Sequence, residues 1–188
     1  MSVCRCVGKP LSFSGISVAV GEAAWEQNLS LLLSLAGDGA DDADAQYVAC
    51  VAVFNLARKG QDVRAQIGRE GGVAMVAAAM GRFEGNMDVQ IAGCKAFQNL
   101  GGTDDEALGA PLGGVGAGGK RRSNKTDIAT QYGGVALVMG AMGRMEDQVE
   151  VQRAGLWALS NLTNRSDAIQ SVVGDAGAVD VCLAAMAR

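Results

Sequence analysis

The segment Val151–Thr163 reads V-Q-R-A-G-L-W-A-L-S-N-L-T, and two weaker copies of it occur earlier in the chain. Residues 89–101 read V-Q-I-A-G-C-K-A-F-Q-N-L-G, and residues 46–57 read Q-Y-V-A-C-V-A-V-F-N-L-A. Each copy places a Gln nine residues before an Asn, and a Leu directly after that Asn. Three copies of one apolar pattern with fixed polar positions indicate a repeated structural unit.

A glycine pair followed by a valine marks the same repeat at a second place. Its copies begin at Gly71 and Gly133, and a degenerate Gly-Ala-Val copy begins at Gly177. The ladder asparagines, Asn55, Asn99 and Asn161, are separated by 44 and then 62 residues, and the glycine markers by 62 and then 44. Two independent markers therefore share one register, with 18 extra residues inserted between Asn99 and Gly133. A period of this length predicts a helical solenoid.

Composition favours helices and argues against several classes of function. Of the 188 residues, 49% are apolar but only 4% are aromatic, which suits closely packed helices better than strands. A net charge of −4 gives no general electrostatic reason to bind nucleic acid, and no run is long and apolar enough to cross a membrane. The chain has no His, which removes the usual base of Ser and Cys nucleophiles and the commonest metal ligand. We therefore expect no enzyme, no metal and no cofactor.

The five cysteines indicate a reducing compartment. Cys50 and Cys94 occupy the same apolar position of the repeat, five residues before the ladder Asn, so we expect both to be buried. Cys4 and Cys6 have no second pair to complete a zinc site. An odd count without disulfide-like spacing predicts a cytoplasmic protein, with the nucleus as the alternative. A signal peptide at residues 1–21 is a weaker alternative, because its apolar part is interrupted by Ser and Gly.

The periodicity divides the chain into an irregular segment, residues 1–21, and a repeat domain, residues 22–188. Apolar spacing predicts helices at 22–36, 62–68, 73–82, 86–100, 127–131, 134–143, 147–162, 166–173 and 177–188, and one ending at Ala57. Residues 37–45 form a loop with four Asp. It lacks the Gly and the terminal Glu of a calcium loop, so we interpret it as an acidic turn at a helix N-terminus.

Short helix, Gly-Gly turn, middle helix and long helix follow one another in each unit. Gly-Gly-Val before an apolar helix, then Val-Gln-x-Ala-Gly-x-x-Ala-Leu-x-Asn-Leu, resembles the armadillo repeat family. The resemblance covers about residues 22–188 apart from the insertion. It implies an all-α fold: a right-handed α-α superhelix, or armadillo-type solenoid, with two full repeats plus partial repeats at both ends. HEAT repeats, which usually lack this Gly-Gly turn and Asn-Leu ending, are the second-ranked alternative.

One stripe of the long helices contains the candidate binding residues. In armadillo proteins the corresponding stripe lines a concave groove, so the resemblance implies a peptide or partner site here. The residues assigned to it are Tyr47, Asn55, Lys95, Asn99, Arg153, Trp157 and Asn161.

The polar residues of this stripe support two interpretations. Trp157 and Asn161, one helical turn apart, resemble the W-x-x-x-N pairs with which importin-alpha binds basic peptides. Only one of the three copies has the Trp, however, and the cations Lys95 and Arg153 favour an acidic segment over a basic one. The alternative is that the ladder asparagines bond helix to helix, because a buried amide must find partners.

The insertion, residues 102–125, contains two near-matches to phosphate-binding loops. Residues 114–121 nearly match a Walker A loop, but Arg121 stands where a Ser or Thr must bind magnesium. Neither this match nor an overlapping G-x-G-x-x-G follows a predicted strand, so we interpret both as products of glycine-rich composition. The basic run Lys120–Lys125 is interpreted as a solvated loop tip. The alternatives are a nuclear-localisation signal, a patch for an anionic partner or an internal ligand for the groove.

These observations predict a non-catalytic protein-interaction module that binds an extended peptide or partner segment. The alternative is a structural section of a longer array or multidomain scaffold without a ligand of its own. In either case we expect a monomer or a part of a longer chain, because a repeat unit buries its apolar face only against its neighbours.

Overall fold

The structure, a computed structural model, describes residues 25–102 and 124–186. All regular secondary structure in these two ranges is helical, as predicted, and it contains no strand. The irregular segment 1–21 and the two phosphate-loop matches lie outside the described residues. No described helix is by itself long and apolar enough to cross a membrane. One pair, Asp167–Asp175 with Ala178–Ala185, reaches that length and composition together but is bent by 75°.

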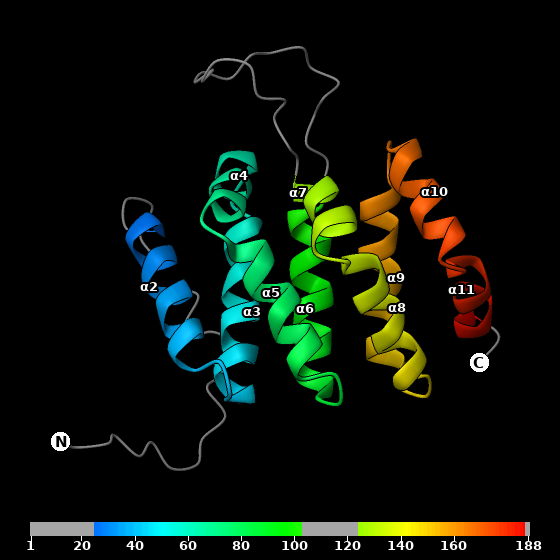
Figure 1. Cartoon of the computed structure of the whole chain (residues 1–188), viewed down its shortest axis with the longest axis horizontal. Coiled ribbons are helices and arrows are strands. Elements are labelled where there is room, and N and C mark those ends of the chain that lie inside the picture. Colours follow the sequence, from blue (N-terminus) through cyan, green and yellow to red (C-terminus); the bar gives the residue numbers. More distant parts are fainter. Residues whose placement is uncertain (1–24, 103–123, 187–188) are drawn as a thin grey trace.

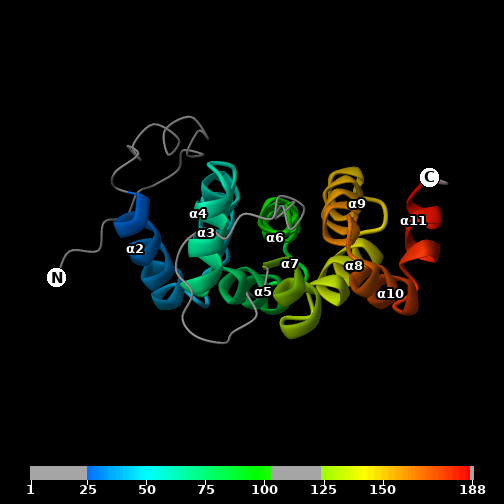
Figure 2. The same cartoon turned by 90° about the horizontal axis from the view of Figure 1, so that it is seen from above.

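Three long helices form one side of the molecule: α3 (Ala43–Ala57), α6 (Met87–Leu100) and α9 (Val149–Thr163). They lie side by side, with α6 packed between α3 and α9 (Figures 1 and 2). The Leu after each ladder Asn is buried, and so are Cys50 and Cys94. These apolar positions of the repeat therefore form part of the core between neighbouring units.

Further helices precede, connect and follow these three. They are α2 (Trp25–Asp38), α4 (Gln61–Arg69), α5 (Gly72–Arg82), α8 (Gly134–Arg144), α10 (Asp167–Asp175) and α11 (Ala178–Met186). Figure 2 shows α5, α8 and α10 along the side opposite α3, α6 and α9. The order of short, middle and long helix is thus the one that the sequence predicted.

The two positions of each Gly-Gly turn require glycine for different physical reasons. Gly71 and Gly133 have φ of +88° and +62°, the left-handed region that a side chain disfavours. The second glycine needs space instead: a Cβ on Gly134 would lie 2.4 Å from Ile128 Cγ2 and 2.8 Å from the Ile128 carbonyl oxygen. In the degenerate copy, Gly177 keeps the left-handed φ, at +77°, and only the second position becomes alanine.

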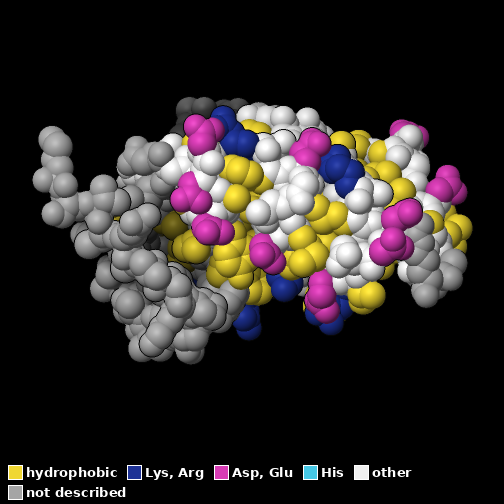
Figure 3. Space-filling model, turned by 90° about the horizontal axis from the view of Figure 1, so that it is seen from below, with side chains coloured by type: hydrophobic (Ala, Val, Ile, Leu, Met, Phe, Trp, Pro, Cys, Tyr) yellow, Lys and Arg dark blue, Asp and Glu magenta, His cyan; other side chains and the backbone are white. Residues whose placement is uncertain are grey.

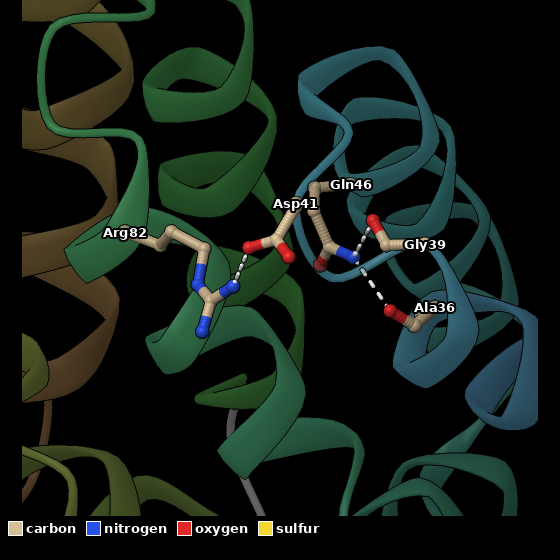
Figure 4. Close-up of polar contacts among 5 residues, drawn as sticks. All are labelled: Ala36, Gly39, Asp41, Gln46 and Arg82. Atoms are coloured by element: carbon tan, nitrogen blue, oxygen red, sulfur yellow. Dashed lines mark hydrogen bonds and ion pairs between the residues drawn. The ribbon is translucent and has the colours of Figure 1, made fainter.

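The repeated glutamines cap the C-termini of the middle helices. In all three copies the side-chain amide donates to two backbone carbonyls, ten and seven residues earlier. Gln46 donates to Ala36 and Gly39 (2.7 and 3.1 Å; Figure 4), Gln90 to Met80 and Phe83 (2.8 and 2.9 Å), and Gln152 to Met142 and Met145 (2.8 and 3.0 Å). These carbonyls lie at helix C-termini, where the last carbonyl groups have no hydrogen-bond partner within the helix. The same bonds identify α2 as the middle helix of the first unit.

Of the predicted acidic loop, residues 37–45, only residues 39–42 lie between α2 and α3, and they form a turn at the N-terminus of α3, as predicted. Asp42 is the N-cap of α3, and its carboxylate accepts from the backbone N–H of Asp44 at 2.9 Å. Asp41 pairs with Arg82 at the end of α5 (Figure 4), which ties the first unit to the second. The described residues contain no group of three His, Cys, Asp or Glu side chains arranged to hold a metal ion.

The end of the insertion differs from the prediction. Asn124 and Lys125 lie in a helix, α7 (Asn124–Thr126), and are not part of a loop. Both residues are 8% exposed. Asn124 Nδ2 donates to the Arg64 carbonyl at 2.6 Å, and Lys125 Nζ donates to the Asn164 carbonyl at 2.7 Å. The expectation that Lys125 belongs to a solvated loop tip is therefore corrected, because this residue is buried and its amine bonds to the end of α9; residues 120–123 lie outside the described residues.

One of the 18 extra residues lies in a π-helical turn, η2 (Asp127–Gln131). Ile67 and Gly72 are five residues apart, whereas their equivalents Ile128 and Gly134 are six apart. The Tyr132 N–H reaches the Asp127 carbonyl, five residues back, at 3.0 Å. The wider turn absorbs the additional residue and keeps Ile128 buried under the glycine turn.

Candidate functional site

The stripe predicted from sequence lies along the three long helices. We call it the long-helix stripe, and its members are the ladder asparagines and the residues four and eight positions before them: Tyr47, Val51, Asn55, Ile91, Lys95, Asn99, Arg153, Trp157 and Asn161. Trp157 and Arg153 are exposed, whereas Val51 is buried and the other six are half-buried. Since α3, α6 and α9 lie side by side, these residues form one continuous surface across three units.

The ladder asparagines bond from unit to unit. Asn99 Nδ2 donates to the Phe54 carbonyl at 3.0 Å, and Asn161 Nδ2 donates to the Gln98 carbonyl at 2.9 Å. Each acceptor directly precedes the ladder Asn of the previous long helix. These bonds support the interpretation that the asparagines join helix to helix. A primary amide has two N–H groups and a carbonyl, so further bonding capacity remains at each residue.

Trp157 is the exposed large hydrophobic residue of the stripe, at 59%. It lies one turn before Asn161 on the same helical face. An indole left in water presents an apolar surface that a partner can cover and a face that attracts cations. The equivalent positions are the buried Val51 and the half-buried Lys95, so the tryptophan is specific to the third unit.

The two cations of the stripe are in different surroundings. Arg153 forms an ion pair with Glu150, one turn earlier, and their side chains are 57% and 53% exposed. A pair this exposed contributes little to stability and can exchange for a carboxylate of a partner. Lys95 is half-buried on α6, the long helix that lies between α3 and α9. The Arg153–Glu150 pair therefore weakens, but does not remove, the positive character that the sequence predicted.

Two apolar residues extend the stripe beyond the predicted set. Met87 and Val149 lie one turn before Ile91 and Arg153, and they are 41% and 75% exposed. They are the first residues of α6 and α9. Figure 3 shows one face of the molecule, on which Asp and Glu side chains are spread among hydrophobic ones. Continuing the four-residue series one further step from the ladder Asn would have found both residues.

A hollow of about 650 Å³ lies on the other side of the molecule, between α5 and α8. Four of its ten lining residues are alanines, among them Ala74, Ala77 and Ala136, whose small side chains leave space open. Arg144 and Glu84 close one part of it with an ion pair at 3.4 Å. None of the predicted site residues lines this hollow.

The buried cysteines do not provide a reactive group at neutral pH. Burial raises the pKa of the Cys50 thiol from 9.0 to about 12. Burial, and to a lesser degree the neighbouring Cys50, raises the pKa of Cys94 to about 12 as well. A thiol must lose its proton to act as a nucleophile or metal ligand, so these two side chains are core residues.

Comparisons of this chain with protein-family models, with curated proteins and with solved structures found no match in any of the three. The described residues define an all-helical protein built from repeated helical units. Its membership of the armadillo family stays a prediction from the repeat pattern.

Proposed function

We propose that this chain is a non-catalytic protein-interaction module whose long-helix stripe binds an extended peptide segment of a partner. We further propose that its helices form a right-handed superhelix of the armadillo type, with the stripe on the concave side. The observation that carries the binding proposal is Trp157, which is 59% exposed on a surface continuous across three units. An exposed indole beside amides and cations offers apolar contact, hydrogen bonds and charge together.

The chemistry of the stripe favours a partner segment that contains carboxylates. Lys95 lies on the stripe, and Arg153 can exchange its exposed Glu150 for a partner carboxylate. The spare N–H and carbonyl of Asn99 and Asn161 suit the backbone of an extended peptide. Binding requires no cofactor. The proposed compartment is the cytoplasm, with the nucleus as the alternative.

A structural role is the second candidate, and the asparagine bonds favour it. Asn99 and Asn161 each donate to a carbonyl of the preceding unit, which is a sufficient reason for their presence. In that case the chain supplies length and curvature to a larger assembly, and Trp157 is an ordinary surface residue. Importin-like binding of basic peptides ranks lower, because only one unit carries the tryptophan.

The test uses a displayed library of random twelve-residue peptides and three proteins. Wild type should enrich acidic peptides, and Trp157→Ala should bind the enriched peptides about tenfold more weakly, because it removes most of one aromatic contact surface. The control is Leu31→Ala, since Leu31 is 58% exposed on α2, outside the stripe. It should bind like wild type. Trp157→Ala is preferred to Asn161→Ala because the latter also removes a bond between units.

Circular dichroism must show equal helicity for the three proteins. If no peptide is enriched, or if Trp157→Ala binds as well as wild type, the structural role is favoured. Enrichment of basic peptides would instead support importin-like recognition.

A further inference from the structure

The hollow between α5 and α8 is formed by residues of two neighbouring units. Ala74 and Ala77 contribute from α5, and Ala136 and Leu137 contribute from α8, so its floor is apolar. Both helices lie on the side opposite the long helices (Figure 2). Its volume of about 650 Å³ lies within the range of roughly 300–1,000 Å³ that is usual for small-molecule sites. The hollow is therefore large enough for a small ligand with an apolar part.

An ion pair lies at one end of the hollow. Arg144 Nη1 is 3.4 Å from Glu84 Oε2, and the two side chains are 39% and 53% exposed. Charge-assisted N–H···O bonds are usually about 2.7–2.9 Å long, so this contact is loose. An arginine has several N–H donors, and one long contact uses little of that capacity. The two opposite charges can therefore each accept a partner from a ligand.

A glycine allows the guanidinium to lie back over α8. A Cβ on Gly140 would lie 3.1 Å from Nη1 and 3.3 Å from Nη2 of Arg144. Gly140 comes one turn after Leu137, so the charged end adjoins the apolar floor. In the second unit the equivalent position is Ala78, and the equivalent arginine, Arg82, does not line the hollow. The charged end thus depends on the arginine of the third unit.

Uncharged polar groups lie at the opposite end. Gln131 and Tyr132 line the hollow before the start of α8, whereas Arg144 is the last residue of that helix. Gln131 Nε2 donates to the Tyr132 hydroxyl at 3.2 Å, which leaves the hydrogen of the hydroxyl for another acceptor. Gln131 ends the π-helical turn η2, and Tyr132 follows it directly. Turns of this kind occur frequently at functional sites.

We propose that this hollow binds a free α-amino acid with a large apolar or aromatic side chain. Its carboxylate bonds to Arg144, its ammonium group bonds to Glu84, and its side chain covers the alanines in the direction of Tyr132. An α-amino acid has its two opposite charges on one carbon atom, and this arrangement matches two opposite charges that lie side by side. A ligand with a single charge would leave one member of the pair without a partner.

The site is separate from the long-helix stripe and does not depend on peptide binding there. A ligand in the hollow contacts α5 and α8 together, so it stabilises the packing of the second unit against the third. Binding should therefore raise the melting temperature of the chain.

The experiment titrates L-tryptophan into the ¹⁵N-labelled full chain and follows the amide chemical shifts. L-tryptophan should bind saturably, with a Kd of ~1 mM or tighter, and the largest shifts should be those of Gly133 and Leu137. Two further probes each lack one charge: tryptamine has no carboxylate, and 3-indolepropionate has no ammonium group. Each should bind about tenfold more weakly than L-tryptophan, because one charge-assisted hydrogen bond is lost.

Substitutions test which charge meets which residue. Arg144→Met should weaken L-tryptophan and 3-indolepropionate about tenfold without weakening tryptamine. Glu84→Gln should weaken L-tryptophan and tryptamine by a similar factor without weakening 3-indolepropionate. The matched control is Arg82→Met, the equivalent arginine at the end of α5, which should bind all three probes like wild type.

Three results would overturn the proposal. The first is the absence of saturable binding by both L-tryptophan and L-leucine up to their solubility limits. The second is equal binding of L-tryptophan, tryptamine and 3-indolepropionate, since the ion pair would then not select the ligand. The third is binding that Arg144→Met and Glu84→Gln leave unchanged, because the ligand would then lie elsewhere on the molecule.

Discussion

A single repeated polar residue caps the C-terminus of α2, α5 and α8. Each repeated Gln is buried and gives both its amide hydrogens to carbonyls at the end of a middle helix. A buried amide without partners is costly, and so is a helix end without a cap. The Gln therefore both pairs its own buried amide and caps the helix end at the turn between the middle and long helices. The sequence showed that the Gln recurs, but only the structure shows why.

We expect Gln152→Ala to lower the free energy of unfolding by about 1–3 kcal/mol, because two buried carbonyls lose their donor. The control is Gln148→Ala, one turn earlier. Gln148 is exposed and its side chain makes no capping bond to α9, so this change should have little effect. Urea unfolding followed by circular dichroism compares the two. Equal losses in both variants would show that the Gln152 bonds do not stabilise the turn.

The second glycine of the turn makes a prediction of its own. In Gly134→Ala the new methyl group would collide with the Ile128 side chain and carbonyl, so we expect a loss of about 1–3 kcal/mol. Gly143→Ala is the control in the same helix, since a Cβ there meets no atom within 4 Å. That change should be neutral or stabilise by up to about 1 kcal/mol, because alanine is the better helix former. Thermal unfolding of both variants checks the difference, and a stable Gly134→Ala would contradict the steric argument.

At the scale of elements, the helices could be predicted closely and their irregularities could not. The predicted helix 62–68 is α4 (Gln61–Arg69), and the predicted helix 147–162 is α9 (Val149–Thr163). Apolar periodicity and glycine turns determine such bounds locally. Asn124 was assigned to the loop, but it is buried because it packs on α4. Its side chain donates to a carbonyl sixty residues away in the sequence. A basic, Gly-rich neighbourhood contains no information about such a contact.

The candidate site was predictable in position but not in the state of its residues. The repeat register placed Asn99, Asn161 and Trp157 on one stripe, as the structure does. It could not show that the asparagines already bond to the preceding helix, or that Arg153 pairs with Glu150. Those contacts depend on how units are offset from one another, and the offset is a property of packing between units rather than of one helix.

The π-helical turn η2 gives a prediction about a whole element. Deleting the exposed Thr130 would restore the five-residue spacing from Ile128 to the second glycine that the first unit has. We expect this variant to fold with a melting temperature close to wild type. Deleting the exposed Arg69 is the control, because it shortens the regular spacing after Ile67 to four and should cost about 2 kcal/mol or more. Differential scanning calorimetry checks both, and similar losses would mean that η2 is required as it stands.

At the scale of the whole molecule, stability resides in the contacts between units. The ladder bonds run from α6 to α3 and from α9 to α6, and Asn124 joins the third unit to α4 of the second. Cys50 and Cys94 lie in α3 and α6 at equivalent positions, close enough for the charge of one to affect the pKa of the other. In a repeat array, interfaces of this kind carry much of the folding free energy. A change that acts on one of these interfaces should therefore be seen in global unfolding.

Alkaline pH provides such a change. In the unfolded chain both thiols lose their protons as the pH rises through 9.0, whereas in the folded protein they keep them until about 12. The folded state then binds more protons than the unfolded state, so the contribution to stability is complete below pH 9.0 and falls towards pH 12. The expected slope is about 1.4 kcal/mol per pH unit for each cysteine. Urea unfolding at a series of pH values measures it.

The matched protein is the double variant Cys50→Ala/Cys94→Ala. At neutral pH it should be less stable than wild type, because it leaves two small cavities between α3 and α6. Lys and Tyr residues also titrate at alkaline pH, but they are the same in both proteins, so the difference between the two stability curves isolates the thiols. The difference in unfolding free energy between the two proteins should shrink as the pH rises above 9.0. Only wild type has two thiols that ionise in the unfolded state while they stay protonated in the folded state. Parallel curves would mean that the interface between α3 and α6 opens to water well before the chain unfolds, because only a hydrated thiol keeps its ordinary pKa.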